Sequence, residues 1–378
     1  MREGWEYKRL GELCDIVMGQ SPMGNSINEN NGIEFHQGKT NFGDKFLMES
    51  GIYTTSPIRI AEKKTILLCV RAPVGIINIT ERQVCIGRGL SSLKPRLGLE
   101  LLYLYYCLLS KQNYFESNST GSTFKAISSK VINNTIIQSP PKPTQLSIVS
   151  ELDKLNELIQ IKKEQLKDYD ALAQSIFYEM FGDPVENEKG WEVKKFGDCF
   201  SIGAGGTPST KVKEYWDNGT IPWIGSNMCQ NCIITETDGK FITEEGLNHS
   251  STKLLSPGTV LVALVGATIG KVGLLRIETC TNQNVAFIKV QEAETFTSEF
   301  VYYHLMGLYG EFMKIGQGNF KMANQGFIKL LPISCPPLSL QQSFAHKIEQ
   351  IERQKAEVQK TITDLETLLA ARMQYWFD

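Results

Sequence analysis

Residues 4–12 read GWEYKRLGE, and residues 190–198 read GWEVKKFGD. Both stretches open with Gly-Trp-Glu and close with an acidic residue. Each is followed by a hydroxyl residue and a proline, Ser21-Pro22 in one copy and Thr207-Pro208 in the other. A match of this length within one chain, with its flanking residues preserved, indicates an internal repeat.

Two more blocks recur in the same order further along. Residues 70–75 (VRAPVG) match residues 265–270 (VGATIG), and the Phe-Lys pair at 124–125 returns at 320–321. The spacing between copies drifts slightly from block to block, as it would after small loop insertions. The chain is therefore expected to be a tandem duplication of roughly 190 residues.

Each copy ends in a long amphipathic helix that begins just after a Pro-Pro pair, at 140–141 and at 336–337. Prolines are common at helix starts, and apolar residues spaced alternately four and three apart are typical of a coiled coil. Lys162 and Lys355 interrupt the two seams. The predicted seam positions are Ile148, Leu152, Leu155, Ile159, Lys162, Leu166, Tyr169, Ala173, Ile176 and Met180, and then Phe344, Ile348, Ile351, Lys355, Val358, Ile362, Leu365, Leu369, Arg372 and Trp376.

Two such helices bury their seams most simply against each other, and an antiparallel pair needs no long return connection. We therefore predict an α+β fold. Two tandem-duplicated globular domains of mixed short strands and helices would be joined by two long antiparallel coiled-coil helices, with pseudo-twofold symmetry. The predicted segments are 1–143 (domain 1), 144–183 (first long helix), 184–337 (domain 2) and 338–378 (second long helix). Within the domains we expect strands at 65–70, 260–265 and 285–290, and short helices at 99–109 and 300–308.

The composition is that of an ordinary soluble protein, with 42% hydrophobic residues, 21% charged residues and a formal net charge of −2. The charge is uneven, because residues 1–143 hold 17 Lys and Arg against 12 Asp and Glu. Any contact with nucleic acid would therefore rest on local patches. Nine cysteines lack a disulfide-framework spacing, and neither a signal peptide nor a membrane-spanning apolar run is apparent. These features predict a reduced, cytoplasmic protein.

Several motifs resemble catalytic or metal sites but lack an essential part. SPPK at 139–142 and CPPL at 335–338 lack the amide or carboxylate and the aromatic ring with which amino-methyltransferases hold a flipped base. GATIGK at 266–271 is one residue short of a phosphate-binding loop, and a turn between strands explains it better. Arg71 and Ile76 stand opposite Gly266 and Lys271 in the first copy. Cys229 and Cys232 have the spacing of half a zinc site, but no second pair is spaced to complete it, and the four histidines are scattered. We therefore expect neither catalysis nor a bound metal.

Guanine edges are read mainly by Arg and Lys, adenine edges by Asn and Gln, and phosphates by any cation. Gly-rich turns at 121–125 and 316–321 and the amide-rich TNQN at 281–284 suit such contacts. An ordinary loop, or side chains that cap a turn before a strand, explains these segments equally well. Residues 23–64 and 209–253 align poorly, as segments that read different half-sites would. The candidate DNA-binding residues are Lys39, Arg59, Arg71, Arg88, Lys125, Asn227, Lys271, Asn282, Gln283, Asn284, Asn319, Lys321, Asn324 and Gln325.

The ordered set of repeats resembles the specificity subunits of type I restriction–modification systems, along essentially the whole chain. The resemblance rests on the two Gly-Trp-Glu openings, on 266–271 and 281–284, and on the Pro-Pro-x-x-x-Gln motifs that precede both helices. It implies two target-recognition domains that read a bipartite double-stranded DNA site, one half-site each. It also implies two methyltransferase subunits docked on the helices and two restriction subunits, with S-adenosylmethionine and ATP/Mg on those partners and no cofactor in this chain. Arg71 in place of glycine departs from the family pattern at that turn.

Other functions fit parts of the pattern. The chain could be the specificity subunit of a related system that methylates and cuts without a separate motor. A non-DNA scaffold, with two ligand-binding domains carried on a coiled coil, would show the same duplication. A stand-alone methyltransferase or nuclease is disfavoured by the incomplete motifs. DNA binding distinguishes the specificity subunits from the scaffold.

Overall fold

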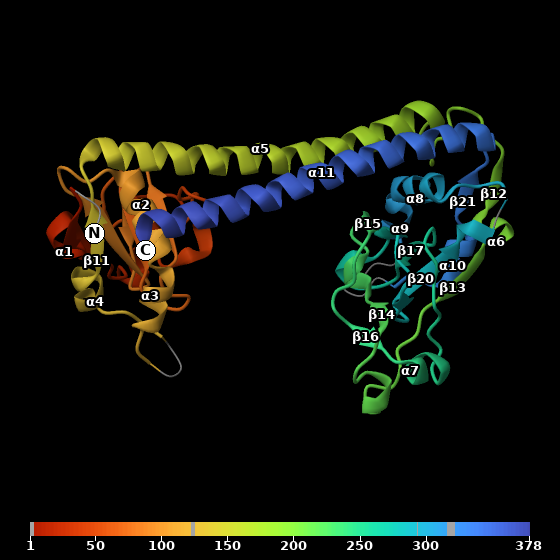
Figure 1. Cartoon of the computed structure of the whole chain (residues 1–378), viewed down its shortest axis with the longest axis horizontal. Coiled ribbons are helices and arrows are strands. Elements are labelled where there is room, and N and C mark those ends of the chain that lie inside the picture. The colour runs from red at the N-terminus through yellow and green to blue at the C-terminus, as the bar shows by residue number, and fades with distance from the viewer. Residues whose placement is uncertain (1–3, 122–124, 293, 316–321) are drawn as a thin grey trace. The chain divides into compact units, whose positions relative to one another are not determined.

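The computed structural model describes residues 4–121, 125–292, 294–315 and 322–378, which form two compact units. Unit 1 comprises Met1–Lys163 and Lys360–Asp378, and unit 2 comprises Glu164–Gln359. Each unit holds one globular domain together with parts of both long helices (Figure 1). Unit 1 is therefore completed by residues from the far end of the sequence.

Domain 1, here residues 4–141, consists of short strands and helices as the sequence predicts. Its strands are β1 (Glu6–Arg9), β2 (Cys14–Met18), β3 (Ile27–Asn28), β4 (Ile33–His36), β5 (Tyr53–Thr54), β6 (Ile60–Ala61), β7 (Thr65–Cys69), β8 (Ile77–Thr80), β9 (Val84–Ile86), β10 (Leu90–Pro95) and β11 (Ile136–Ser139). Its helices are α1 (Leu10–Leu13), α2 (Leu101–Ser110), α3 (Gln112–Ser117) and α4 (Ser129–Asn134), with 3-10 turns at Gly24–Ser26 and Lys39–Asn41.

Domain 2, here residues 182–337, repeats this plan with a few additions. Its strands are β12 (Val193–Lys195), β13 (Ser201–Ala204), β14 (Ile221–Ile224), β15 (Cys232–Ile234), β16 (Phe241–Ile242), β17 (Val260–Ala263), β18 (Val272–Leu275), β19 (Cys280–Thr281), β20 (Val285–Lys289) and β21 (Pro332–Ser334). Its helices are α6 (Phe196–Cys199), α7 (Glu244–Asn248), α8 (Ser298–Gly307), α9 (Tyr309–Met313) and α10 (Gln325–Leu330). Its 3-10 turns are Lys213–Tyr215, Ser226–Met228, Gly266–Thr268 and Val290–Glu292.

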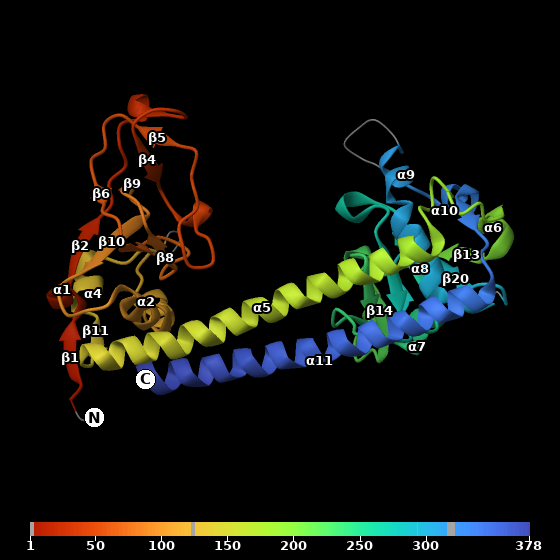
Figure 2. The same ribbon diagram turned by 90° about the horizontal axis from the view of Figure 1, so that it is seen from above.

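The sheets of the two domains share their central strands in the same order. Domain 1 has a sheet of order β2-β10-β7-β8, and domain 2 has the equivalent order β13-β20-β17-β18 with β15 added at the edge. A second sheet contains β4 beside β9 in domain 1 and β14 beside β19 in domain 2. Figure 2 shows the second sheet of domain 1 on the side of the domain away from α5. The structure thus confirms the tandem duplication.

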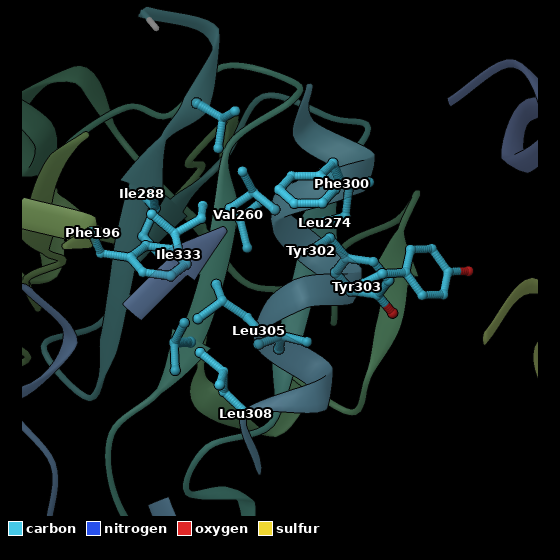
Figure 3. Close-up of a cluster of buried hydrophobic side chains, with 14 of the residues drawn as sticks. Phe196, Val260, Leu274, Ile288, Phe300, Tyr302, Tyr303, Leu305, Leu308 and Ile333 are labelled. Atoms are coloured by element: carbon cyan, nitrogen blue, oxygen red, sulfur yellow. The ribbon is translucent and has the colours of Figure 1, made fainter. Parts of the chain in front are cut away.

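The core of each domain lies between its first sheet and one apolar helix. In domain 2, Phe300 and Leu305 of α8, with Leu308 just after it, pack against Val260 and Leu274 of the sheet (Figure 3). All five side chains are fully buried. Helix α2 plays the same part in domain 1. Burial of apolar side chains stabilises by about 25 cal/mol per Å² removed from water, so these helices fix the sheets against the rest of each unit.

The long helices are α5 (Lys142–Phe181) and α11 (Leu338–Phe377), each of 40 residues. Every predicted seam position on both helices is buried or half-buried, which confirms the heptad pattern. The pairing is antiparallel within each unit: Lys163 contacts Glu366 in unit 1, and Lys355 contacts Asp170 in unit 2. Lys355 therefore forms an ion pair across the seam.

The repeated Pro-Pro-x-x-x-Gln motif ties each domain to the start of its own helix. Gln145 donates from Nε2 to the carbonyls of Gly98 (3.0 Å) and Pro140 (2.9 Å) and accepts from the Glu100 amide (2.9 Å). Gln341 donates in the same way to Thr295 (3.1 Å) and Pro336 (2.9 Å) and accepts from the Thr297 amide (3.0 Å). The prolines thus mark helix starts, as predicted, and the glutamine holds the preceding loop.

A second polar contact seats each domain on its helix, with different chemistry in the two copies. In unit 1, Lys45 donates to Asp153 of α5 (2.6 Å), which also accepts from the Tyr106 hydroxyl (2.5 Å). In unit 2, Arg276 donates to Glu352 of α11 (2.8 Å) and to Glu299 of α8 (2.9 Å). Lys45 is thereby engaged within the protein.

Each long helix ends in the core of a domain other than the one it leaves. Phe177 and Phe181, at the end of α5, are buried in the core of unit 2. Phe377, at the end of α11, is 3% exposed in the core of unit 1, where its ring lies 5.7 Å from Tyr103. In both copies, therefore, aromatic residues at the end of a long helix complete the core of a domain. Among the described residues, no helix combines the length and the apolarity needed to cross a membrane.

Candidate nucleic-acid interface

The candidate residues gather where the central strands of each domain end. In domain 1, β4 pairs in parallel with β9, with Phe35 opposite Cys85. In domain 2, β14 pairs in parallel with β19, with Trp223 opposite Cys280. Parallel strands end at the same edge of a sheet, so the loops that follow them lie together, and ligands commonly bind at such an edge.

One backbone hydrogen bond fixes the register of these loops in both domains. The Gly87 amide donates to the His36 carbonyl (2.7 Å), and the Asn282 amide donates to the Ile224 carbonyl (3.1 Å). The loops that follow therefore start in register, with Gly87 aligned with Asn282 and His36 with Ile224, although their 3-10 turns begin three residues after His36 and two residues after Ile224. We call them, with the adjoining turns, the strand-end surface of each domain: residues 37–41, 70–75, 87–89 and 125–127 in domain 1, and residues 225–230, 264–271, 282–284 and 322–325 in domain 2.

In domain 1 this edge is basic. Lys39, Arg71 and Arg88 are exposed on three of its loops, and Arg71 forms an isolated bridge to Ala126, next to Lys125. Gln37, Lys39, Arg71 and Gly89 line one surface hollow of about 180 Å³. Arg59 belongs to the same edge, because its carbonyl accepts from the amide of Ile86 at the end of β9 (2.9 Å). The structure thus brings together all five basic candidates of this domain.

In domain 2 the equivalent edge carries carboxamides. Asn282, Gln283 and Asn284 follow β19, and Asn282 Oδ1 accepts from the Asn284 amide (3.0 Å), which caps a turn just before β20. The turn-capping interpretation of this segment is therefore confirmed. Lys271 donates to Gln230 Oε1 (2.7 Å), whose Nε2 donates to the Asn227 carbonyl (3.2 Å). Lys271 is thus attached to the Asn227 loop.

The remaining candidates of domain 2 adjoin this edge through Leu264. The Leu264 amide donates to the Asn284 carbonyl (2.8 Å), and its carbonyl accepts from the Ala323 amide (2.9 Å). Asn324 is the N-cap of α10, with Oδ1 accepting from the Phe327 amide (2.9 Å), and Gln325 is the half-buried first residue of that helix. The candidates Asn319 and Lys321 lie outside the described residues.

The turn after β7 and β17 corrects one predicted correspondence. Residues 266–271 do form the predicted turn between two antiparallel strands, β17 and β18. Arg71, however, forms an antiparallel β-bridge with Ala126. In domain 2 the equivalent β-bridge, to Met322, is formed by Val265 and not by Gly266. Ile76 and Lys271 do correspond, because their carbonyls accept from the amides of Cys69 (2.8 Å) and Ala263 (2.9 Å). This turn is therefore one residue longer in the second copy than in the first.

Sequence reasoning missed the hydroxyl residues that support the edge. The Ser21 hydroxyl accepts from the Arg88 amide (3.4 Å), and the Thr207 hydroxyl donates to Gln283 Oε1 (2.5 Å). These are the hydroxyl residues that precede Pro22 and Pro208 in the opening repeat. Their recurrence was visible in the sequence, but their distance along the chain from Arg88 and Gln283 concealed the contact.

A further hollow of about 380 Å³ adjoins Thr207 in domain 2. Trp216 and Trp223 form its wall, with ring centroids 5.2 Å apart at 84°. Lys213 and Lys240 also line it. The strand-end surface of domain 2 therefore has an aromatic neighbour beside its carboxamides.

A buried cysteine thiol lies beside the strand-end surface of each domain, and both thiols stay protonated near neutral pH. Burial raises the pKa of Cys69 to about 12, although Lys39 opposes the shift. Burial likewise raises the pKa of Cys280 to about 11. A buried protonated thiol is a poor nucleophile and a poor metal ligand. Among the described residues, no group of three or more His, Cys, Asp or Glu side chains could hold a metal ion.

Comparison with known proteins gives consistent matches. The family model for the type I restriction modification DNA specificity domain matches residues 2–168 and again residues 188–367. The MjaX specificity subunit of Methanocaldococcus jannaschii is 34% identical over 178 residues, which are 46% of this chain and 42% of that protein. The MjaIX specificity subunit of the same organism is 26% identical over 300 residues, 70% of this chain and 67% of that protein. The matched part of the chain thus spans less than half of the first relative.

A chain from a structural study of complex assembly and conformational transition in the type I R-M system has the same fold, with a TM-score of 0.65. It is 18% identical, and the match covers 99% of this chain and 97% of that one. The family model matches once in each copy of the duplication and includes both strand-end surfaces. The chain therefore belongs to the family of type I restriction–modification DNA specificity domains.

Proposed function

We propose that the chain is the sequence-reading subunit of a type I restriction–modification assembly, and that each domain reads one half of a bipartite DNA target. The observation that carries this proposal is the strand-end surface. Exposed Lys, Arg, Asn and Gln side chains from distant parts of the sequence meet at the same edge of both domains. These are the side-chain types that contact guanine, adenine and phosphate.

The chain itself performs no chemistry in this proposal. Two methyltransferase subunits dock on the long helices and bring S-adenosylmethionine, and two restriction subunits bring ATP and Mg²⁺. The near-neutral charge of the chain fits this division of labour, because a net charge of −2 supplies little general attraction to DNA. Much of the phosphate contact would then come from the partner subunits.

Binding to random DNA duplexes, with and without the methyltransferase subunits, tests the proposal. We expect salt-dependent binding that becomes sequence-selective in the complex, because phosphate contacts release counterions. The absence of DNA binding in both conditions would contradict the proposal and favour a protein scaffold.

A domain exchange tests the assignment of half-sites. Residues 23–130 would be replaced by those of another specificity subunit, and the methylated sites would be mapped by sequencing. We expect one half-site to change while the other stays the same. A change in both halves would show that the domains do not read DNA independently.

A further inference from the structure

The loops that follow these matched strand ends carry different side chains in the two domains. Counting three residues on from His36 and from Ile224, which accept the equivalent hydrogen bonds, gives Lys39 in domain 1 and Asn227 in domain 2. The donors of the same two hydrogen bonds are Gly87 and Asn282. The residues that follow these donors are Arg88 in domain 1 and Gln283 in domain 2. Domain 1 thus has two cations where domain 2 has two carboxamides.

The neighbouring residues show that the two pairs of loops approach each other differently. At Gly89, a Cβ atom would lie 2.2 Å from the Gln37 carbonyl oxygen, so no larger residue fits there. Domain 2 has Asn284 at the position of Gly89, and Gly225 at the position of Gln37. The clash at Gly89 is with a backbone oxygen, which every residue has, so the two loops must lie further apart in domain 2 to admit Asn284.

The two cations of domain 1 are available to a ligand. Lys39 and Arg88 are exposed, and within the described ranges their side chains have no hydrogen bond or ion pair. The Arg88 backbone is fixed, because its amide donates to Ser21 (3.4 Å) and the flanking Gly87 amide donates to His36 (2.7 Å). A guanidinium on a fixed backbone can donate two hydrogen bonds to the O6 and N7 acceptors of guanine.

The two carboxamides of domain 2 are exposed and oriented by neighbours. Thr207 donates to Gln283 Oε1 (2.5 Å), which sets the amide plane and leaves one acceptor position on that oxygen and both donors on the nitrogen. Asn227 makes a long contact to Asp238 through Nδ2 (3.4 Å). A carboxamide with one donor and one acceptor facing outward matches N7 and the N6 amino group of adenine.

We propose that the two domains read different purines from equivalent strand ends: Lys39 and Arg88 select guanine in one half-site, and Asn227 and Gln283 select adenine in the other. The proposal rests on the proposed function, since it assigns bases to the same strand-end surfaces. It makes these four residues determinants of base identity, whereas a phosphate contact would serve any sequence.

The test is selection from randomised duplexes by the full chain in complex with its methyltransferase subunits. The variants are Lys39→Asn with Arg88→Gln, and the reciprocal Asn227→Lys with Gln283→Arg. Lys63→Gln is the matched control, because Lys63 is an exposed cation of domain 1 in the loop before β7, at the opposite end of that strand from Arg71. Unchanged base selection at the other half-site shows that each variant chain is folded.

We expect the first variant to weaken a guanine preference on the order of tenfold or more at one or two positions of one half-site, and to gain adenine there. The reciprocal variant should weaken adenine and gain guanine in the other half-site, and the control should select the wild-type sequence. Loss of affinity for all sequences with unchanged base preference would overturn the proposal and assign the residues to phosphates. So would a wild-type site with no guanine in the half affected by the first variant. If the wild-type complex selects no sequence at all, the proposed function fails, and this inference fails with it.

Discussion

The guanidinium of Arg372 and the carboxylate of Glu151 form an ion pair that holds the end of α11 on the start of α5. The Trp376 indole N–H donates to the same carboxylate (3.0 Å). The Arg372 guanidinium also lies over the rings of Tyr375 (4.7 Å) and Trp376 (5.1 Å). Arg372 accordingly lowers the pKa of Glu151. The Glu151 carboxylate of α5 thus holds both Arg372 and Trp376 of α11 in unit 1.

Glu151→Ala should destabilise unit 1 by about 1 kcal/mol, because the pair is half-exposed but also positions two aromatic rings. Urea unfolding of the full chain measures the change. Glu164→Ala is the control, since Glu164 pairs with the exposed Lys167 on its own helix turn. Equal effects of the two substitutions would mean that the cluster adds nothing to a surface ion pair.

The Gln145 and Gln341 contacts predict matched losses in the two units. Replacement of either by Leu leaves a buried amide N–H and two carbonyl groups without their partner, and each unpaired buried group costs about 1–3 kcal/mol. We expect a loss of about 2–4 kcal/mol for either variant, after partial rehydration. Gln160→Leu, on an exposed position of α5, should change stability little. Thermal unfolding measures all three, and a neutral effect of Gln145→Leu would show that the loop has other support.

His304 predicts a pH dependence of unit 2. Burial lowers the pKa of His304 from 6.5 to about 4, although the Pro332 carbonyl opposes the shift. Between these values the unfolded chain binds a proton that the folded chain does not, so stability is intact above pH 6.5 and falls as the pH drops toward 4. The full difference corresponds to about 3 kcal/mol.

Chemical unfolding between pH 7 and pH 4 measures this loss. His304→Leu should reduce the dependence above pH 4.5 without abolishing it, because burial also lowers the pKa of His36. Glu34 adds a contribution at the lower end of this window. Burial tends to raise its pKa, but hydrogen bonds from Arg82 and the Ser50 amide outweigh it and lower the pKa from 4.5 to about 2, so the stability from Glu34 begins to fall near pH 4.5 and is lost by about pH 2. An unchanged slope in the His304 variant would contradict the assignment.

Arg71 and Lys125 lie on adjoining segments of domain 1, where the Ala72 amide donates to the Lys125 carbonyl (3.1 Å). If both side chains neutralise phosphates, Arg71→Ala with Lys125→Ala should lower the slope of log K against log salt by roughly 0.9 for each phosphate that is no longer neutralised. Fluorescence anisotropy at several salt concentrations measures the slope. Lys63→Ala should leave it unchanged. A reduced affinity at an unchanged slope would indicate that Arg71 and Lys125 bind bases.

The sequence predicted the architecture well, because the relevant signals are local or periodic. The heptad seams required only spacing, and the observed helices begin and end within two residues of the predicted 144–183 and 338–378. The strands around 65–70 and 260–265 followed from short apolar runs. The turn at 266–271 could be separated from a phosphate-binding loop because the residues that such a loop requires are missing.

The details of the candidate site depend on contacts between distant segments. The correspondence of Lys39 with Asn227 was invisible, since loops of different length separate the two blocks and the register is set by backbone hydrogen bonds. The dependence of register on backbone hydrogen bonds also explains why the sequence paired Arg71 with Gly266 and not with Val265. The engagement of Lys45 with Asp153 also needed the structure, because a lysine that pairs inside the protein looks, in sequence, like one that is offered to DNA.

The position of Phe377 has a consequence for biosynthesis. Domains usually fold as they leave the ribosome, at about 5–20 residues per second. The core of unit 1 includes Phe377, so residues up to Lys163 must be held without their final core residue while roughly 200 more are translated, for on the order of ten to forty seconds. During that interval the nascent first domain exposes the apolar surface around Tyr103, against which Phe377 packs in the finished protein. Nonsense mutations or ribosome stalling shortly upstream of the Phe377 codon would therefore damage the domain made first.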